Sequence, residues 1–305
     1  MATPFDRRAT AEDVTAGLDL SGKTIVVTGV NSGLGHETLR VLSQRGAHVI
    51  GAARTLEKAR AACKSVAGDT TPVACELAEM ESVRDCARTI HALDAPVDVL
   101  ICNAGIMAPA RLSVKNGLES QFLTNHMGHF LLTYLLQDAL KKAPEGRIVM
   151  LSSLAHALAG RRAIDYDNLD GSRGYRPWQF YGQSKLANLL TARAFNERLR
   201  GTSVTANAVH PGVIGTNLSR DVGGFSGWLL RNPAVSALSE RLLNKSVAEG
   251  ASTQCFVATH PSLKGVGGRY FADNAEARPV IRGNPRGLAE RLWEFSVDYL
   301  ASYLR

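Results

Sequence analysis

The sequence predicts an α/β fold in which a doubly wound parallel sheet carries helices on both of its faces. Short β-branched apolar runs alternate with amphipathic runs of helical periodicity from residue 23 to residue 271, which is the pattern of repeated βαβ units. A glycine-rich loop joins the first strand to the first helix of this series. Polar candidates for chemistry follow several later strands, at the edge where such sheets bind ligands. We expect one domain, 23–305, preceded by an N-terminal arm, 1–22.

Size and charge restrict the classes of protein that this chain could be. Of its 305 residues 45% are hydrophobic and 21% are charged, so the chain can build a large core. No run reaches the ~18 apolar residues of a membrane span, and the N-terminus lacks a secretory signal, so we expect a cytoplasmic protein without a membrane partner. The net charge is +7, but the basic residues are spread along the chain, so we do not expect nucleic-acid binding. A small-molecule substrate is the expected partner, and a homo-oligomer stays open.

Cysteine and histidine usage gives no sign of a disulfide framework or a metal site. His126 and His129 are three residues apart, but no carboxylate or third ligand accompanies them. We expect two satisfied histidines within a helix and no metal. The cysteines form no C-x-x-C pair and are expected to be buried free thiols: Cys63, Cys75, Cys86, Cys102 and Cys255.

The alternation of patterns gives each expected element a range. Strands are expected at 23–28, 47–53, 71–74, 97–102, 146–151, 201–209 and 267–271. Helices are expected at 36–46, 55–68, 79–93, 118–139, 181–199, 246–259 and 285–304. In the arm, Thr10 and Asp13 have the spacing of a capping box for a short helix over 11–16.

The loop at 28–35, Thr-Gly-Val-Asn-Ser-Gly-Leu-Gly, predicts a phosphate-binding turn. It lies between a buried strand and a helix within one βαβ unit, which raises a glycine pattern above chance. Glycines let the backbone approach a pyrophosphate, and the helix N-terminus supplies N–H groups. The expected cofactor contacts in this loop are Gly29, Asn31, Ser32, Gly33, Leu34 and Gly35.

The end of the second strand favours NADP(H) over NAD. Folds that bind NAD place an acidic residue about 20 residues past the glycines, where it holds the ribose 2′-hydroxyl. Ala53 stands at that position here, and Arg54 follows it. An arginine can bind a 2′-phosphate in two-pronged fashion, and Lys58 could add charge. The alternative is that Arg54 is an ordinary surface arginine.

Tyr181 and Lys185 are the leading candidates for proton chemistry. Residues four apart lie on one face of a helix, so the phenol and the ammonium would share one space. A nearby cation favours phenolate and would lower the pKa of the tyrosine. Alone the spacing is weak, because an aromatic core contact beside a lysine stem gives the same pattern.

Together the motifs resemble the short-chain dehydrogenase/reductase family. The glycine spacing is T-G-x-x-x-G-x-G, Asn-Ala-Gly at 103–105 follows a buried strand, and Asn-His-x-Gly-His-Phe occupies 125–130. The gap of 28 positions from Ser153 to Tyr181, with Ser-Ser-Leu-Ala-His at 152–156, is similar to the retinol-dehydrogenase-like and WW-domain-oxidoreductase-like branch. The resemblance implies a Rossmann fold and hydride transfer between a nicotinamide and a carbonyl or alcohol carbon.

The resemblance also implies roles for individual residues. Tyr181 would exchange the proton, Ser153 would stabilise the substrate oxygen, Lys185 would assist the tyrosine and hold the nicotinamide ribose, and Asn125 would order a water that resupplies the proton. Ser152 is the fallback for the serine. Further implied cofactor contacts are Glu76 (in place of the commoner Asp), Leu77, Asn103, Ala104, Gly105, Tyr181, Lys185, Pro211, Gly212, Ile214 and Thr216.

The substrate pocket is expected between a loop insert, 156–178, and a lid, 213–245. A membrane- or partner-docking patch is the alternative interpretation of the lid. The expected function is NADP-dependent reduction of a ketone or aldehyde of a small apolar substrate. One alternative is a reductase of C=C or imine bonds. The other is an NADP-sensing regulator without turnover. The proposed substrate contacts are His156, Leu158, Trp178, Phe225 and Trp228.

Overall fold

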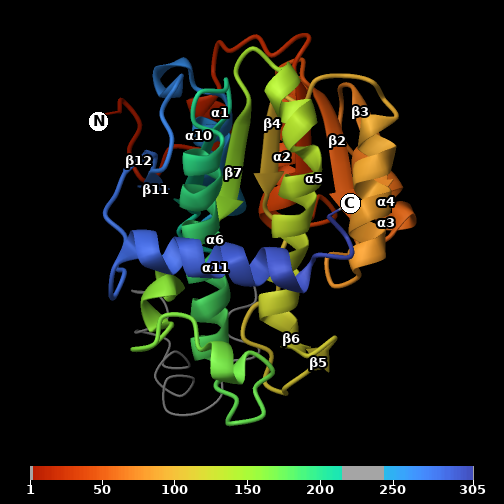
Figure 1. The fold of residues 1–305 in the computed structure, drawn as a ribbon. Helices are drawn as coiled ribbons and strands as arrows, with labels where there is room; N and C mark the ends of the chain where they lie inside the picture. The colour runs from red at the N-terminus through yellow and green to blue at the C-terminus, as the bar shows by residue number, and fades with distance from the viewer. Residues whose placement is uncertain (1–2, 215–243, 305) are drawn as a thin grey trace.

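The computed structural model describes residues 3–214 and 244–304. Within them, eight strands form one sheet in the order β12-β11-β8-β7-β4-β1-β2-β3, and all neighbouring strands are parallel except β11 and β12, which are antiparallel (Figure 1). This confirms the predicted doubly wound sheet. The strands are β1 Thr24–Thr28, β2 His48–Ala53, β3 Thr70–Ala74, β4 Val99–Cys102, β7 Arg147–Leu151, β8 Thr205–His210, β11 Tyr270–Ala272 and β12 Ala275–Glu276.

Helices cover both faces of the sheet, and each face has its own hydrophobic core. Ile25 and Val27 of β1 pack with α2 and α10, whereas Val26 between them packs with α4, α5 and α6, because successive side chains of a strand point to opposite faces. Among the described residues, no helix is long and apolar enough to cross a membrane. The helices are α1 Ala11–Val14, α2 Gly33–Gln44, α3 Leu56–Lys64, α4 Met80–His91, α5 Gly128–Lys142, α6 Pro177–Arg198, α10 Val247–Thr259 and α11 Pro285–Tyr299.

The last helix, α11, lies across α6 and α5 on one side of the molecule (Figure 1). Its Trp293 ring packs edge-on against Phe130 of α5 and Phe195 of α6, with centroids 4.9 Å away in each case. Arg198 stacks on the same indole at 4.0 Å. The predicted amphipathic helix is therefore a third layer on this face of the sheet.

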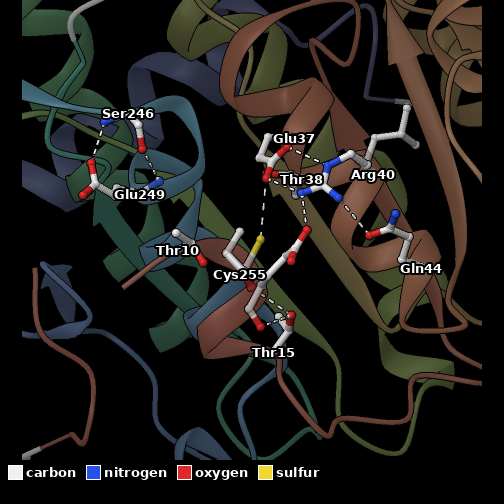
Figure 2. A network of polar contacts seen from close by, with 12 residues as sticks. Thr10, Thr15, Glu37, Thr38, Arg40, Gln44, Ser246, Glu249 and Cys255 are labelled. Atoms are coloured by element: carbon white, nitrogen blue, oxygen red, sulfur yellow. Dashed lines mark hydrogen bonds and ion pairs between the residues drawn. The ribbon is translucent and has the colours of Figure 1, made fainter. Parts of the chain in front are cut away.

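The N-terminal arm docks against α2 and α10. Its predicted capping box is confirmed, because the Thr10 side chain accepts from the Asp13 N–H and the Asp13 carboxylate accepts from the Thr10 N–H. Figure 2 shows the polar contacts around this junction, in which Arg40 of α2 pairs with Glu37 and with Glu12 of the arm, each at 2.7 Å. The arm therefore braces the helix that follows the glycine-rich loop.

The expected long helix over 118–139 is wrong at its beginning. A short hairpin, β5 Val114–Lys115 with β6 Leu118–Glu119, comes first. A π-helical turn, η1 Phe122–Met127, follows, and α5 begins at Gly128. A Cβ on Gly128 would lie 2.3 Å from the main-chain oxygen of Leu77, so only glycine lets the helix approach the strand-end segment so closely.

The insert and the lid also differ in detail from the expected loops. Short 3₁₀ turns, η2 Leu154–Leu158 and η3 Tyr166–Asn168, occupy part of the insert. Helix α6 begins at Pro177, where proline suits the first helical position. Two short strands, β9 Val213–Ile214 and β10 Asn244–Lys245, pair with each other and flank residues 215–243, so most of the predicted lid lies outside the described residues.

Candidate active site

A cavity of about 390 Å³ opens at the carboxyl edge of the sheet. It lies where the strand order reverses between β1 and β4, which is the ligand site of doubly wound folds. Many of the predicted cofactor residues line it together: Gly29, Asn31, Ser32, Leu34, Gly35, Arg54, Glu76, Leu77, Asn103, Ala104 and Gly105. The sequence missed Thr124 and Ile106 on its wall, since neither belongs to a recognisable motif.

The glycine-rich loop has the form that a pyrophosphate requires. Ser32 is the N-cap of α2 but makes no side-chain capping bond, so the first N–H groups of the helix stay open to an anion. A Cβ on Gly35 would lie 2.2 Å from the Gly29 oxygen, so the helix and the loop touch as backbone. Gly29 and Gly33 adopt positive φ values of 76° and 54°. These residues fit a dinucleotide cofactor.

Asn103 bridges the ends of β1 and β4. Its amide nitrogen donates to the main-chain oxygen of Thr28 at 2.8 Å. In return, the Thr28 hydroxyl oxygen accepts from the N–H groups of Asn103 and Ala104, each at 3.0 Å. The loop after β4 is thereby fixed against the start of the glycine-rich loop.

Three residues that line the cavity at and after the end of β2 bear on cofactor choice. Ala53 is buried at the end of β2, and Arg54 and Lys58 line the cavity beside it. Arg54 pairs through Nε with Glu76 at 3.1 Å, and 60% of the arginine side chain is exposed. No acidic side chain stands at the position of Ala53, where an NAD-binding fold would hold the ribose.

A second cavity, of about 570 Å³, adjoins the first, and Leu34 and Gly105 line both. The predicted residues on its wall are Gly33, Ser153, Leu158, Trp178, Tyr181, Pro211 and Gly212. Val213, at the start of the predicted lid, also lines it, but sequence reasoning missed four apolar residues there, Met107, Leu154, Ala155 and Val247. Their apolar side chains resemble ordinary core or loop residues in sequence and carry no motif.

Tyr181 and Lys185 do not interact as the sequence predicted. Burial raises the pKa of Tyr181 to about 12, although a hydrogen bond with Ser153 lowers it in part. The Lys185 ammonium lies 5.7 Å from the centroid of the Tyr181 ring and donates to the Leu151 oxygen at 3.1 Å. Burial lowers the pKa of Lys185 to about 8. The phenol is therefore a protonated acid at neutral pH, because burial disfavours the charged phenolate.

The two serines after β7 are placed differently. The Ser152 hydroxyl donates to the main-chain oxygen of Lys185 at 2.7 Å, so it holds α6 against the strand end. Ser153 begins the η2 turn, where its hydroxyl oxygen accepts from the Ala155 N–H at 3.2 Å, and it is hydrogen-bonded to Tyr181. This arrangement favours Ser153 as the residue that acts with the tyrosine.

Asn125 and His156 lie behind the cavities rather than on their walls. Asn125 accepts from the Ile106 N–H at 2.8 Å and donates to the Ser184 hydroxyl at 2.9 Å. Ser184 belongs to the same helix as Tyr181, so Asn125 connects that helix to the loop after β4, which lines the cofactor cavity. His156 is buried, with Nδ1 2.5 Å from the Ser153 oxygen, and its Nε2 accepts from the Val280 N–H. His156 therefore fixes the main-chain oxygen of Ser153.

The remaining predicted contacts lie at the lid. The backbone of Ile214 pairs with Lys245 in the β9–β10 ladder. Thr216, Phe225 and Trp228 lie outside the described residues. Across residues 3–214 and 244–304, no group of three His, Cys, Asp or Glu side chains could hold a metal ion.

A doubly wound sheet with a phosphate-binding loop and a Ser–Tyr–Lys site at its switch point defines a nicotinamide-dependent oxidoreductase. The chain belongs to the short-chain dehydrogenase family, whose model, described as "short chain dehydrogenase", matches residues 23–224.

Relatives in sequence and in structure agree with this family. The chain is 42% identical to the short-chain dehydrogenase TIC 32 B, chloroplastic, of Brassica napus, over 98% of this chain and 95% of the relative. It is 39% identical to human retinol dehydrogenase 13, over 90% of this chain and 83% of that protein. A crystal structure of an uncharacterized protein from Mycobacterium Paratuberculosis has a TM-score of 0.73 at 33% identity, covering 94% of this chain and 97% of that one. The retinol-dehydrogenase-like branch that the motifs indicated is thus confirmed.

Proposed function

We propose that the protein is an NADP(H)-dependent reductase of carbonyl groups in small apolar substrates. The observation that carries this proposal is the position of Tyr181. Its phenol, protonated at neutral pH, lines the apolar cavity, and that cavity adjoins the cofactor cavity at Leu34 and Gly105. An acid on the wall of this adjoining cavity can protonate an oxygen whose carbon faces the cofactor.

Each side chain of the site has a part in this reaction. A bound nicotinamide would supply the hydride. Tyr181 hydrogen-bonds the substrate oxygen and gives it a proton, and its raised pKa keeps that proton available. The Ser153 hydroxyl stabilises charge that develops on the same oxygen. Lys185 is cationic below its pKa of about 8, so it favours the phenolate that remains after proton transfer.

The choice of NADP(H) rests on Ala53, Arg54 and Lys58. Arg54 is held by Glu76 in an exposed ion pair, and such pairs contribute only ~0–1 kcal/mol. A 2′-phosphate can therefore take the guanidinium, since arginine and phosphate form strong two-pronged hydrogen bonds. Ala53 offers no carboxylate that would repel this phosphate.

The apolar substrate rests on the second cavity. Leu154, Leu158, Trp178, Met107 and Val213 all line it and are each more than a third exposed, which leaves apolar surface free for a ligand. Relatives named as retinol dehydrogenases support alcohol and carbonyl chemistry on an apolar compound. A cytoplasmic location belongs to the same proposal, although one relative is named as chloroplastic.

Turnover of NADPH with a panel of aldehydes and ketones tests the proposal. We expect apolar carbonyl compounds to be reduced to alcohols, and Tyr181→Phe to lose ~10²–10⁴-fold in kcat while it still binds NADPH. Products identified as saturated carbonyl compounds or amines would overturn carbonyl reduction in favour of C=C or imine reduction. A wild type that binds NADPH but is as inactive as Tyr181→Phe on every substrate would overturn the enzymatic function.

A further inference from the structure

His129 connects two parts of the site that belong to different strands and helices. Its Nδ1 lies 2.9 Å from the main-chain oxygen of Asn125. Its Nε2 lies 2.9 Å from the hydroxyl oxygen of Thr28. Thr28 in turn accepts from the N–H groups of Asn103 and Ala104, which line the cofactor cavity. One imidazole therefore spans from the π-helical turn to the loop after β4.

The partners determine where every proton of this chain of contacts lies. A main-chain oxygen only accepts, so the Nδ1 of His129 carries a hydrogen. The ring is fully buried and burial lowers its pKa to about 4, so at neutral pH the Nε2 is bare and accepts. The Thr28 hydroxyl then donates to Nε2 at 2.9 Å in preference to the Ile101 oxygen at 3.5 Å, which leaves its own oxygen free for the two N–H groups. All the hydrogen bonds point one way, and such chains strengthen one another.

In the part of the chain that is described, no charged group favours protonation of the His129 ring. The groups that bear electrostatically on the ring are the ammonium of Lys185 and the neutral ring of His126. Lys185 opposes protonation of His129, as burial does. A neutral ring with a fixed tautomer is therefore stable over the pH range in which the site would work.

The backbone at Asn125 has an uncommon conformation. It lies in the π-helical turn η1, where the Gly128 N–H bonds to the Leu123 oxygen five residues back. Turns of this kind are rare and concentrate at functional sites. The side chain of Asn125 is already held by Ile106 and Ser184, so His129 adds the contact that fixes the main-chain oxygen.

We propose that His129 is a positioning residue that links the Asn125 carbonyl to Thr28. The link holds the loop after β4, which carries Asn103 and Ala104, in a fixed position relative to the π-helical turn that carries Asn125. The proposal rests on the proposed hydride transfer, because the resupply of a proton matters only if one is consumed. His129 touches neither cavity, so it acts through Asn125 and Thr28.

Three substitutions at His129 separate its two contacts. His129→Asn keeps a donor near the place of Nδ1, His129→Gln reaches toward Thr28 but loses that donor, and His129→Phe keeps the ring shape with neither. We expect kcat to fall ~10–100-fold in the Gln and Phe variants, as expected when a reacting group is misplaced by about 1 Å. The Asn variant loses the contact with Thr28 and should show a similar fall in kcat, because the link needs both contacts, and NADPH affinity should change less than kcat in all three. The solvent isotope effect on kcat should rise in the Gln and Phe variants.

His126→Asn is the matched control. His126 is equally buried and neutral on the preceding turn, but it faces Ser296 of α11 and Thr191 of α6. The control should lose stability as His129→Phe does, yet keep kcat. Equal losses of kcat in the two would overturn the proposal and reduce His129 to a packing residue, as would an unchanged kcat in a folded His129→Phe.

Two measurements do not depend on turnover. Nitrogen-15 NMR of the wild type should show the neutral Nδ1–H tautomer of His129 at pH 7, and an Nε2–H tautomer would overturn the proposal. Amide hydrogen exchange at Asn103 and Ala104 should speed up in His129→Phe but not in His126→Asn. If these hold while no carbonyl compound is ever reduced, the coupling stands and the proposed function fails.

Discussion

The ammonium of Lys185 lies 3.1 Å from the main-chain oxygen of Leu151 at the end of β7. This contact keeps the buried amine at the edge of the sheet, 5.7 Å from the centroid of the Tyr181 ring. Burial without a carboxylate partner lowers its pKa to about 8. The cation is therefore the group of the catalytic site that titrates nearest to neutral pH.

The rate of carbonyl reduction should fall as the pH rises through about 8. The protonated amine favours proton transfer from Tyr181, and it exists below its pKa, whereas the phenol keeps its proton up to about 12. We expect a plateau of kcat below the lower value and a tenfold loss per pH unit well above it. Lys185→Arg, whose guanidinium stays charged, should lose this limb of the profile. A limb that persists in the arginine variant would assign the titration to another group.

Acid should destabilise the fold through three buried histidines. Burial lowers the pKa of His126 to about 3 and those of His129 and His210 to about 4, against about 6.5 in an unfolded chain. Between pH 6.5 and 4 the unfolded state thus binds more protons, so stability is full above 6.5 and declines below it. Each histidine should remove ~1.4 kcal/mol of unfolding free energy per pH unit. Urea unfolding at pH 7, 6 and 5 measures this loss, and equal stability at all three would contradict it.

The strands, the glycine-rich loop and the order of motifs could be predicted because their signals are local. A buried parallel strand such as β1 is a short apolar run, and its glycines follow at a fixed spacing. Most of the cofactor-contact candidates that these signals predicted line one cavity.

Other features could not be predicted because they depend on contacts between distant residues. The π-helical turn ending at Met127 is not separated from an α-helix by the apolar pattern, and the approach of Gly128 to Leu77 beside it joins residues that are distant in sequence. The pKa of Tyr181 depends on how deeply the fold buries the phenol, which helical spacing does not reveal. His129 and Thr28 are 101 residues apart in sequence, so their contact leaves no local pattern.

Gly182→Ala should destabilise the helix that carries Tyr181. A Cβ at position 182 would lie 2.6 Å from the Ala155 oxygen and 2.8 Å from the Ala159 nitrogen, so α6 and the η2 turn would have to separate. Such overpacking costs ~1–3 kcal/mol, and Ser153 at the start of η2 would move with it. Gly287→Ala is the control, because a Cβ there is only 3.4 Å from the Asn284 amide nitrogen and alanine favours a helix. Thermal unfolding should separate the two variants, and equal melting temperatures would contradict the packing argument.

Arg54→Gln should weaken the preference for NADPH without harming the use of NADH. The guanidinium lies in the cofactor cavity with only an exposed pair to Glu76, and a hydrogen bond to a charged group contributes ~1.5–3 kcal/mol. We expect kcat/KM for NADPH to fall ~10–100-fold and that for NADH to stay within threefold. Arg60→Gln is the matched control, since Arg60 is exposed on helix α3, which begins just after Arg54, and lies outside the cavity. The adjacent Ala53→Asp should shift the preference further toward NADH by supplying the missing acid. Equal losses for both cofactors in Arg54→Gln would mean that Arg54 does not bind the 2′-phosphate.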